Sequence, residues 1–207
     1  MGRSFVQRLS SSHPVPGGGA AAAYCASVAL ALLEKICRVE LGRLDDSSPK
    51  VLFWQNILAK VRKLIRSLTV LREEDGEAYL NLAEAKALYA AGDERLGDAL
   101  RAAIECPLDI LRAVNVGLTC LSAAGESCRA HLLSDLLVVA ELLSATGTGV
   151  NHIIKANLTM CTNISTRDSY LKDLETINAE IYTLCSKVKE LIIARQTTMT
   201  NRRAGSP

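Results

Sequence analysis

The residue pattern best suited to holding a ligand is a glycine turn, Pro-Val-Pro-Gly-Gly-Gly, at residues 14–19. Its two prolines favour an extended approach to the turn. Gly17, Gly18 and Gly19 permit torsions and close contacts that a Cβ would forbid, and the four alanines that follow predict the start of a helix. The N–H groups and the positive dipole end of such a helix suit a carboxylate or phosphate. The alternative is a helix entry whose glycines serve only close helix packing.

The sequence pairs this turn with neither a nucleotide-binding motif nor a metal motif. No Gly-Lys-Ser/Thr follows the glycines, and no strand precedes them as a dinucleotide-binding fingerprint requires. The three histidines stand alone, and no two of the seven cysteines have C-x-x-C spacing. We therefore expect no metal and no cofactor, and free buried thiols typical of a reducing, cytoplasmic compartment.

The composition indicates a single all-α domain over residues 1–207. Apolar residues make up 49% of the chain but aromatic residues only 4%, so alanine and leucine must carry the packing. This balance favours close-packed helices over a sandwich or barrel. A net charge of +2, with acids and bases interspersed, argues against nucleic acid as a partner. The apolar run at 20–33 is too short for a membrane span, so we expect no membrane partner.

Helical spacing of the apolar residues divides the chain into about eight or nine helices that form one bundle. Polar residues at 73–76 interrupt one apolar stripe, Pro107 is expected to start a helix, and Gly147 and Gly149 interrupt another stripe. The polar residues 196–207 are expected to form a flexible tail. The expected helices cover residues 3–12, 20–42, 51–72, 79–91, 94–105, 107–124, 137–143, 150–163 and 166–195.

Six short motifs follow one another along the chain. They are Pro-Gly-Gly-Gly, Val-Glu-Leu-Gly-Arg, Glu-Asp-Gly-Glu-Ala-Tyr, Cys-Pro-Leu, Ser-Asp and Ala-Asn-Leu, at residues 16–19, 39–43, 74–79, 106–108, 134–135 and 156–158. Their order and spacing resemble the cyclodeaminase/cyclohydrolase family, which includes the C-terminal half of formiminotransferase-cyclodeaminase and free-standing methenyltetrahydrofolate cyclohydrolases. The resemblance covers residues 4–195, and its most specific parts are the proline-triglycine turn and the D-x-x-A-[FY] element.

This resemblance implies an all-helical, dimeric enzyme that acts on one-carbon derivatives of tetrahydrofolate. A cyclodeaminase closes 5-formiminotetrahydrofolate to the 5,10-methenyl form and releases ammonia, whereas a cyclohydrolase adds water to the methenyl bridge and gives 10-formyltetrahydrofolate. Both reactions pass through a tetrahedral carbon between N5 and N10, so one proton-handling group could serve either. A chain without a formiminotransferase domain favours the cyclohydrolase. Apolar helices rich in small residues also favour a homodimer.

Asp75 matches the acidic residue of the D-x-x-A-[FY] element, to which the resemblance assigns catalysis. A carboxylate beside the folate bridge would stabilise the cationic amidinium and move a proton to or from N10 or the departing amine. Glu73 and Glu74 would disfavour ionisation of Asp75 if they lay close to it in space. Taken alone, this acidic cluster is also typical of a helix cap.

The resemblance extends the site to further residues, each of which also has an ordinary structural interpretation. It implies that the turn of Pro16 and the three glycines lines the pterin or the glutamate tail of the substrate. Ser134 and Asp135 would contact the pterin edge or cap their own helix. Asn157 would hydrogen-bond the pterin or satisfy a buried carbonyl. Arg43 would meet the glutamate carboxylates or remain a solvated residue at a helix end.

The chain departs from the family pattern near the expected pocket. Cys128 and Arg129 stand where the family usually has a Gly-Asn turn ahead of the Ser-Asp pair. Ile153 stands where an asparagine is common, and residues 144–149 contain less alanine than expected. A non-catalytic, dimeric helical module that binds folate is therefore the alternative function.

Overall fold

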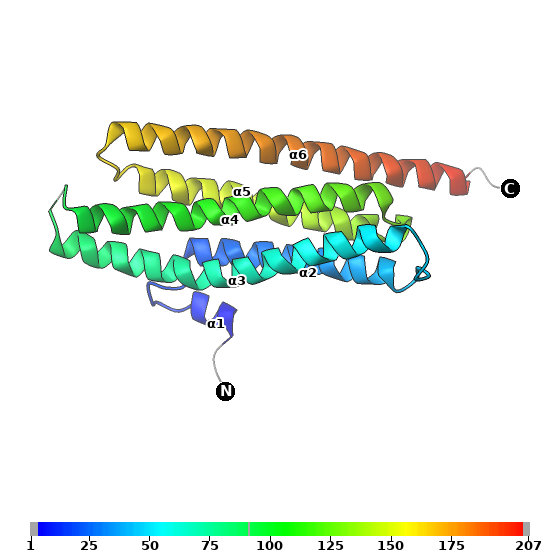
Figure 1. The fold of residues 1–207 in the computed structure, drawn as a ribbon, viewed down its shortest axis with the longest axis horizontal. Helices are drawn as coiled ribbons and strands as arrows, with labels where there is room; N and C mark the ends of the chain where they lie inside the picture. Colours follow the sequence, from blue (N-terminus) through cyan, green and yellow to red (C-terminus); the bar gives the residue numbers. More distant parts are fainter. Residues whose placement is uncertain (1–3, 91, 205–207) are drawn as a thin grey trace.

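The computed structural model describes residues 4–90 and 92–204, with side chains as far as residue 198. Within these residues the regular structure is entirely helical, which confirms the all-α class (Figure 1). The elements are α1 (Phe5–Leu9), α2 (Gly18–Leu41), α3 (Lys50–Leu88), α4 (Glu94–Ser127), α5 (Leu133–Leu158) and α6 (Ile164–Ala204), with a 3₁₀ turn at Ala130–Leu132 before α5.

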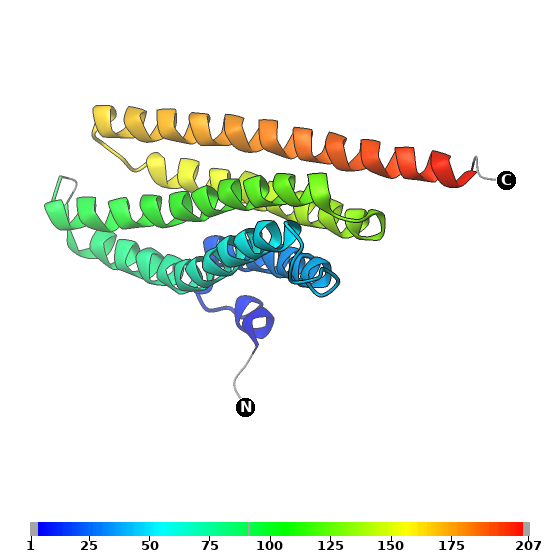
Figure 2. The ribbon, with the colours of Figure 1, turned by 45° about the vertical axis from the view of Figure 1, so that its right-hand side comes forward.

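Helices α2 to α5 form an antiparallel bundle in which α2 packs against both α3 and α5, and α4 closes the other side. The long helix α6 lies on α4 and α5, whereas the short α1 lies on the opposite side of the bundle, beside α2 and α3 (Figures 1 and 2). Because consecutive helices run in opposite directions, the start of α2 lies at the same end of the bundle as the ends of α3 and α5.

Small residues allow the helices around α2 to approach closely. Ala20, Ala23, Ala26 and Ala29 are fully buried and recur every third residue, so they place one narrow face of α2 against its neighbours. Opposite this helix, a Cβ on Gly117 of α4 would lie 3.1 Å from a methyl group of Leu30 and would force the packing to adjust. The predicted reliance on small and aliphatic core residues is therefore visible in the α2–α4 contact.

The expectation of eight or nine helices was wrong, because three expected breaks lie within continuous helices of the described chain. The residues at 73–76 lie inside α3, Pro107 inside α4, and Gly147 and Gly149 inside α5. A glycine costs a helix about 1 kcal/mol relative to alanine, which tertiary packing can offset. Gly147 shows how, since a Cβ there would already touch Ile181 and Leu111.

The ends of the chain differ in length from the expected helices. The first helix is limited to α1, where Ser4 caps the helix and accepts from the N–H of Gln7; Arg3 lies outside the described residues. The last helix is longer than expected, since α6 continues to Ala204 through most of the polar segment that was expected to be a flexible tail. Residues 205–207 lie outside the described part of the chain.

Among the described residues, three segments are long and apolar enough to cross a membrane by length and composition alone: α2, α4 and the stretch Ala130–Leu158. The first of them extends well beyond the apolar run 20–33 that the sequence had marked as too short. All three contribute buried residues to the common core of the bundle, so core packing accounts for much of their apolar surface.

Candidate active site

A cavity of about 210 Å³ lies where the glycine turn meets α3, α4 and α5. It is lined by Pro14, Val15, Gly17, Gly18, Gly19, Asp75, Ala78, Tyr79, Leu82, Ala103, Ile153 and Asn157. Most of this lining is apolar or backbone, and Asp75 is its one carboxylate. The antiparallel bundle thus brings three of the expected site elements together: the triglycine turn, Asp75 and Asn157.

Asp75 lies in the interior of α3, and its carboxylate closes the N-terminus of α2. Its Oδ2 accepts a hydrogen bond of 2.8 Å from the backbone N–H of Ala20. The N-cap residue of α2 is Gly17, which has no side chain with which to cap the helix. Asp75 therefore caps α2 from a neighbouring helix, rather than capping its own helix as the acidic cluster suggested.

The glycines of the turn serve close packing and not unusual backbone torsions. Gly18 and Gly19 belong to the helix, and Gly17 is extended at φ −109°. A Cβ on Gly19 would overlap the carboxylate of Asp75, whereas one on Gly18 would make an ordinary 3.5 Å contact with Ile153. In the described chain the only glycine with positive φ is Gly92, in the connection between α3 and α4. Gly19 is therefore required for the close approach of Asp75.

Burial raises the pKa of Asp75 above its ordinary value, although the hydrogen bond from Ala20 favours the charged form. The expected cause, repulsion by Glu73 and Glu74, is not among the causes. Glu73 is turned to Arg72, and Glu74 lines a separate cavity between α3 and α4. Partial burial of Asp75 therefore favours the protonated form of its carboxyl group.

Asn157 lies in the last turn of α5, on the opposite side of the cavity from α3. Its Nδ2 donates a hydrogen bond of 2.7 Å to the backbone carbonyl of Ala103 in α4. Asn157 therefore does pair with a buried carbonyl, which is the structural interpretation given to it in the sequence analysis. Because Asn157 also lines the cavity, its amide oxygen is the group that a ligand could meet.

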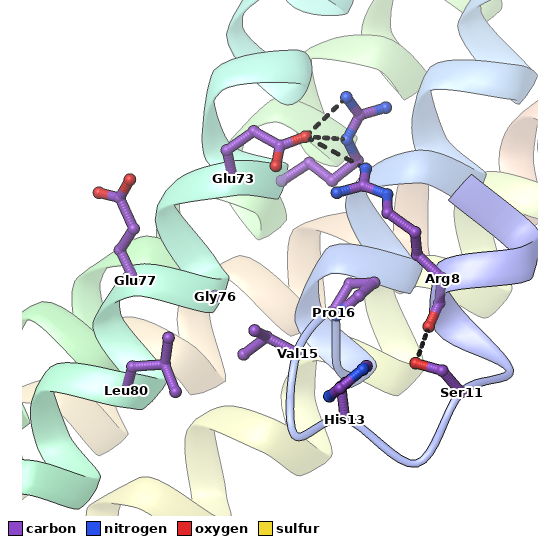
Figure 3. A pocket seen from close by; sticks show the side chains of 10 residues that line it. Arg8, Ser11, His13, Val15, Pro16, Glu73, Gly76, Glu77 and Leu80 are labelled. Atoms are coloured by element: carbon purple, nitrogen blue, oxygen red, sulfur yellow. Dashed lines mark hydrogen bonds and ion pairs between the residues drawn. The ribbon is translucent and has the colours of Figure 1, made fainter. Parts of the chain in front are cut away.

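A second cavity, of about 270 Å³, adjoins the first along Val15 (Figure 3). Pro16 lines this second cavity rather than the one that holds Asp75. Figure 3 shows Glu73 facing the guanidinium of Arg8, and Glu73 also pairs with Arg72 at 2.8 Å. The rest of the wall includes Ser11, His13, Gly76, Glu77 and Leu80.

The remaining expected site residues lie at the other end of the bundle. Arg43 follows the C-terminus of α2, and Ser134 and Asp135 begin α5. The 23 residues between Ser134 and Asn157 correspond to roughly 35 Å of helix. Within one chain, therefore, Arg43, Ser134 and Asp135 do not share the cavity of Asp75.

Two of the departures from the family pattern, Ile153 and Arg129, lie at opposite ends of the bundle. Ile153 lines the cavity, directly beside Gly18. Arg129 lies at the far end, where its backbone N–H and guanidinium both donate to the buried carboxylate of Glu40 at 3.1 Å. The first departure changes the lining of the candidate site, and the second neutralises a buried acid.

Sequence reasoning missed the residues that complete the cavity beside Asp75. Tyr79 and Leu82 were assigned to a separate helix after an expected break at 73–76, yet α3 is continuous and aligns them with Asp75 at spacings of four and seven residues. Arg72, three residues before Asp75, lines the adjoining second cavity, and the expected break likewise separated it from Tyr79 and Leu82. Treating the stripe as unbroken would have placed all four on adjacent faces of one helix.

The described residues contain no cluster of three or more histidine, cysteine or acidic side chains that could hold a metal ion. All seven cysteines are free thiols, as expected. Cys106 lies close to the site: burial raises the pKa of its thiol to about 12, with a smaller contribution from the charge of Asp75. This thiol is therefore protonated, and it donates to the carbonyl of Leu71.

Comparison with known proteins identifies the family. Residues 2–176 match the formiminotransferase-cyclodeaminase family, so the chain belongs to this family, as its motif order predicted. A methenyltetrahydrofolate cyclohydrolase from Methylorubrum extorquens is 26% identical over 201 residues, covering 91% of this chain and 94% of that protein.

The fold is also shared with a solved structure. The crystal structure of formiminotetrahydrofolate cyclodeaminase from Thermotoga maritima matches with a TM-score of 0.84 and 22% identity, covering 93% of this chain and 96% of that one. At this level of identity the likeness establishes the fold.

Proposed function

We propose that this chain is a folate enzyme that acts at the N5/N10 bridge of a tetrahydrofolate derivative, as a methenyltetrahydrofolate cyclohydrolase or a formiminotetrahydrofolate cyclodeaminase. The observation that carries the proposal is the partly buried carboxyl of Asp75, held at the N-terminus of α2 inside a cavity. The curated relative named a cyclohydrolase and the family match support the same chemistry.

In the cyclohydrolase reaction, the bridge carbon is an electrophile because N5 and N10 share its positive charge. Asp75 takes a proton from water as the oxygen bonds to this carbon, which gives a neutral tetrahedral adduct. The protonated carboxyl then donates to N5 as the C–N5 bond breaks, and the adduct hydroxyl releases its proton to solvent as it becomes the carbonyl of the formyl group on N10. A carboxyl with a raised pKa suits both steps, since it must accept and release a proton.

In the cyclodeaminase reaction, N10 attacks the formimino carbon and its proton passes to the imine nitrogen, which becomes an amine. The protonated carboxyl of Asp75 then donates to this amine, which leaves as ammonia and gives the 5,10-methenyl cation. Neither route needs a Lewis acid, because the carbon is already activated; the proposal therefore includes no metal and no cofactor.

The first turn of α2 would contribute to binding. The N–H of Ala20 is used by Asp75, but those of Gly18 and Gly19 belong to the same turn and have no partner within the helix. Both glycines line the cavity, so their N–H groups can meet an acceptor atom of the pterin. Asn157 offers a complementary acceptor from the far wall.

Purified protein should be assayed with both substrates. The absorbance of 5,10-methenyltetrahydrofolate reports hydrolysis and its reversal, and ammonia release from 5-formiminotetrahydrofolate reports cyclodeamination. Acceleration of either reaction supports the proposal and identifies the activity. Folate binding without turnover of either substrate would instead support the non-catalytic binding module, which is compatible with the capping role of Asp75. A protein that neither binds folate nor turns over either substrate would contradict both the enzyme and the binding module.

A further inference from the structure

Pro107 lies inside α4, where a proline removes one helical hydrogen bond. Because proline has no N–H, the carbonyl four residues earlier, that of Ala103, loses its partner within the helix. Ala103 is almost fully buried, at 6% exposure, and a buried carbonyl needs a donor. The helix continues past this point, so the donor must come from outside α4.

Asn157 of α5 supplies that donor. Its Nδ2 lies 2.7 Å from the Ala103 carbonyl oxygen. Only the NH₂ end of an amide can pair with a carbonyl, so this contact fixes which end of Asn157 faces α4. The oxygen is turned away from that carbonyl, and Asn157 lies in the cavity wall with Ala103 and Asp75.

We propose that Pro107 is a positioning residue for the substrate site. By freeing the Ala103 carbonyl, it orients Asn157 so that Oδ1 presents a hydrogen-bond acceptor to the cavity. The proposal rests on the proposed function for its ligand, because the pterin ring of a folate carries N–H donors that this acceptor can hold. Asn157 then fixes the ring while Asp75 moves the proton, which separates binding from proton transfer between two walls of one cavity.

If the hydrogen bond from Asn157 to the Ala103 carbonyl only holds α5 against α4, different results are expected. In that case Asn157 serves only to satisfy a carbonyl, and removing Pro107 improves the helix without consequence for the ligand. The positioning role predicts opposite effects on the two properties: Pro107→Ala gives a more stable protein that holds its substrate less well.

The test is a double-mutant cycle of wild type, P107A, N157A and P107A/N157A, with melting temperature, KM and kcat measured for each. N157A should lower the melting temperature by about 5 °C where Pro107 is present, because it leaves a buried carbonyl unpaired, and by much less in the P107A background. P107A should raise KM about tenfold with kcat little changed, because an oriented acceptor is lost. The matched control is P49A, a proline substitution at the exposed start of α3, which should leave KM unchanged.

Affinity for 5-formyltetrahydrofolate, measured by titration, gives a readout independent of turnover and should weaken in P107A as KM rises. An unaltered KM and affinity in P107A would overturn the positioning role even if the enzyme is fully active. Equal losses of melting temperature for N157A in both backgrounds would overturn the link through Ala103. A wild-type protein that neither binds nor turns over any folate would overturn the proposed function, and this inference with it.

Discussion

Asp75 lies where it is compatible with both roles that the sequence presented as alternatives, a helix cap and a proton-transfer group. Its carboxylate caps α2 by accepting from Ala20, and the same group forms part of the cavity wall. A cap and a proton-transfer group are compatible, because Oδ2 faces the helix end and the carboxylate has a second oxygen. Catalysis by Asp75 would therefore use a side chain that the fold already holds in one orientation.

The raised pKa of Asp75 should make stability depend on pH in a defined direction. Between its ordinary value of 3.8 and the raised value, the folded protein retains a proton that the unfolded chain has released. The contribution of this group to stability is thus full below about pH 3.8 and is lost as pH rises through the folded pKa.

Asp75→Asn removes this titration while keeping the shape of the side chain. We expect the free energy of unfolding of the variant, relative to wild type, to increase between pH 4 and pH 7 as the wild type loses its contribution. Urea denaturation at a series of pH values measures this difference. A difference that stays constant or falls over that range would show that the pKa of Asp75 is not raised.

At the scale of elements, the glycine turn and α3 function as one unit. The first turn of α2 approaches α3 so closely that only glycine fits at position 19 beside the Asp75 carboxylate. Gly76, the next residue along α3, packs against Val15 from the approach to the turn. Substitutions at the glycines of 17–19 should therefore have different effects, because each glycine has different neighbours.

Gly19→Ala should damage the site, whereas Gly97→Ala, in α4, should not. The alanine at 19 collides with Asp75 and displaces either the carboxylate or the helix end, which we expect to cost about 1–3 kcal/mol of stability and most of the activity. At position 97 the new methyl has nothing within 4 Å, so this variant is the matched control. Denaturant melts and turnover measured side by side decide the matter: two variants that behave alike would contradict the assigned contact.

The sequence predicts the helical class and the helix-forming segments well, but it misplaces their breaks. A polar cluster at 73–76 and a proline at 107 are ordinary stop signals, and each is overridden here by a tertiary contact. Val15 packs onto Gly76, and Asn157 satisfies the carbonyl that Pro107 leaves free. Such contacts join segments 54 or more residues apart and have no local signal.

At the scale of the molecule, the antiparallel bundle determines which motifs form a site. It gathers the glycine turn, Asp75 and Asn157 at one end and leaves Arg43, Ser134 and Asp135 at the other. Motif order could predict the family but not this division, because it depends on the direction in which each helix runs. Arg8 and Arg72 line the second cavity, which adjoins the cavity of Asp75 along Val15.

We predict a homodimer in solution. Several large apolar side chains remain exposed on the bundle, among them Val70 at 56% and Val116 at 46%, on neighbouring helices α3 and α4. Burial of such a surface would stabilise association. Sedimentation velocity at micromolar concentration should show a species of twice the chain mass, and a monomer alone would contradict the prediction.

The central claim, that Asp75 carries the proton in folate chemistry at this cavity, is tested most directly by the turnover of Asp75→Asn with whichever substrate the wild type accepts. The amide keeps an oxygen to accept from Ala20, so circular dichroism and folate affinity should change little. Because the amide cannot transfer the proton, turnover should fall a hundredfold or more. A folded variant that retains more than about half of wild-type turnover would show that another group handles the proton.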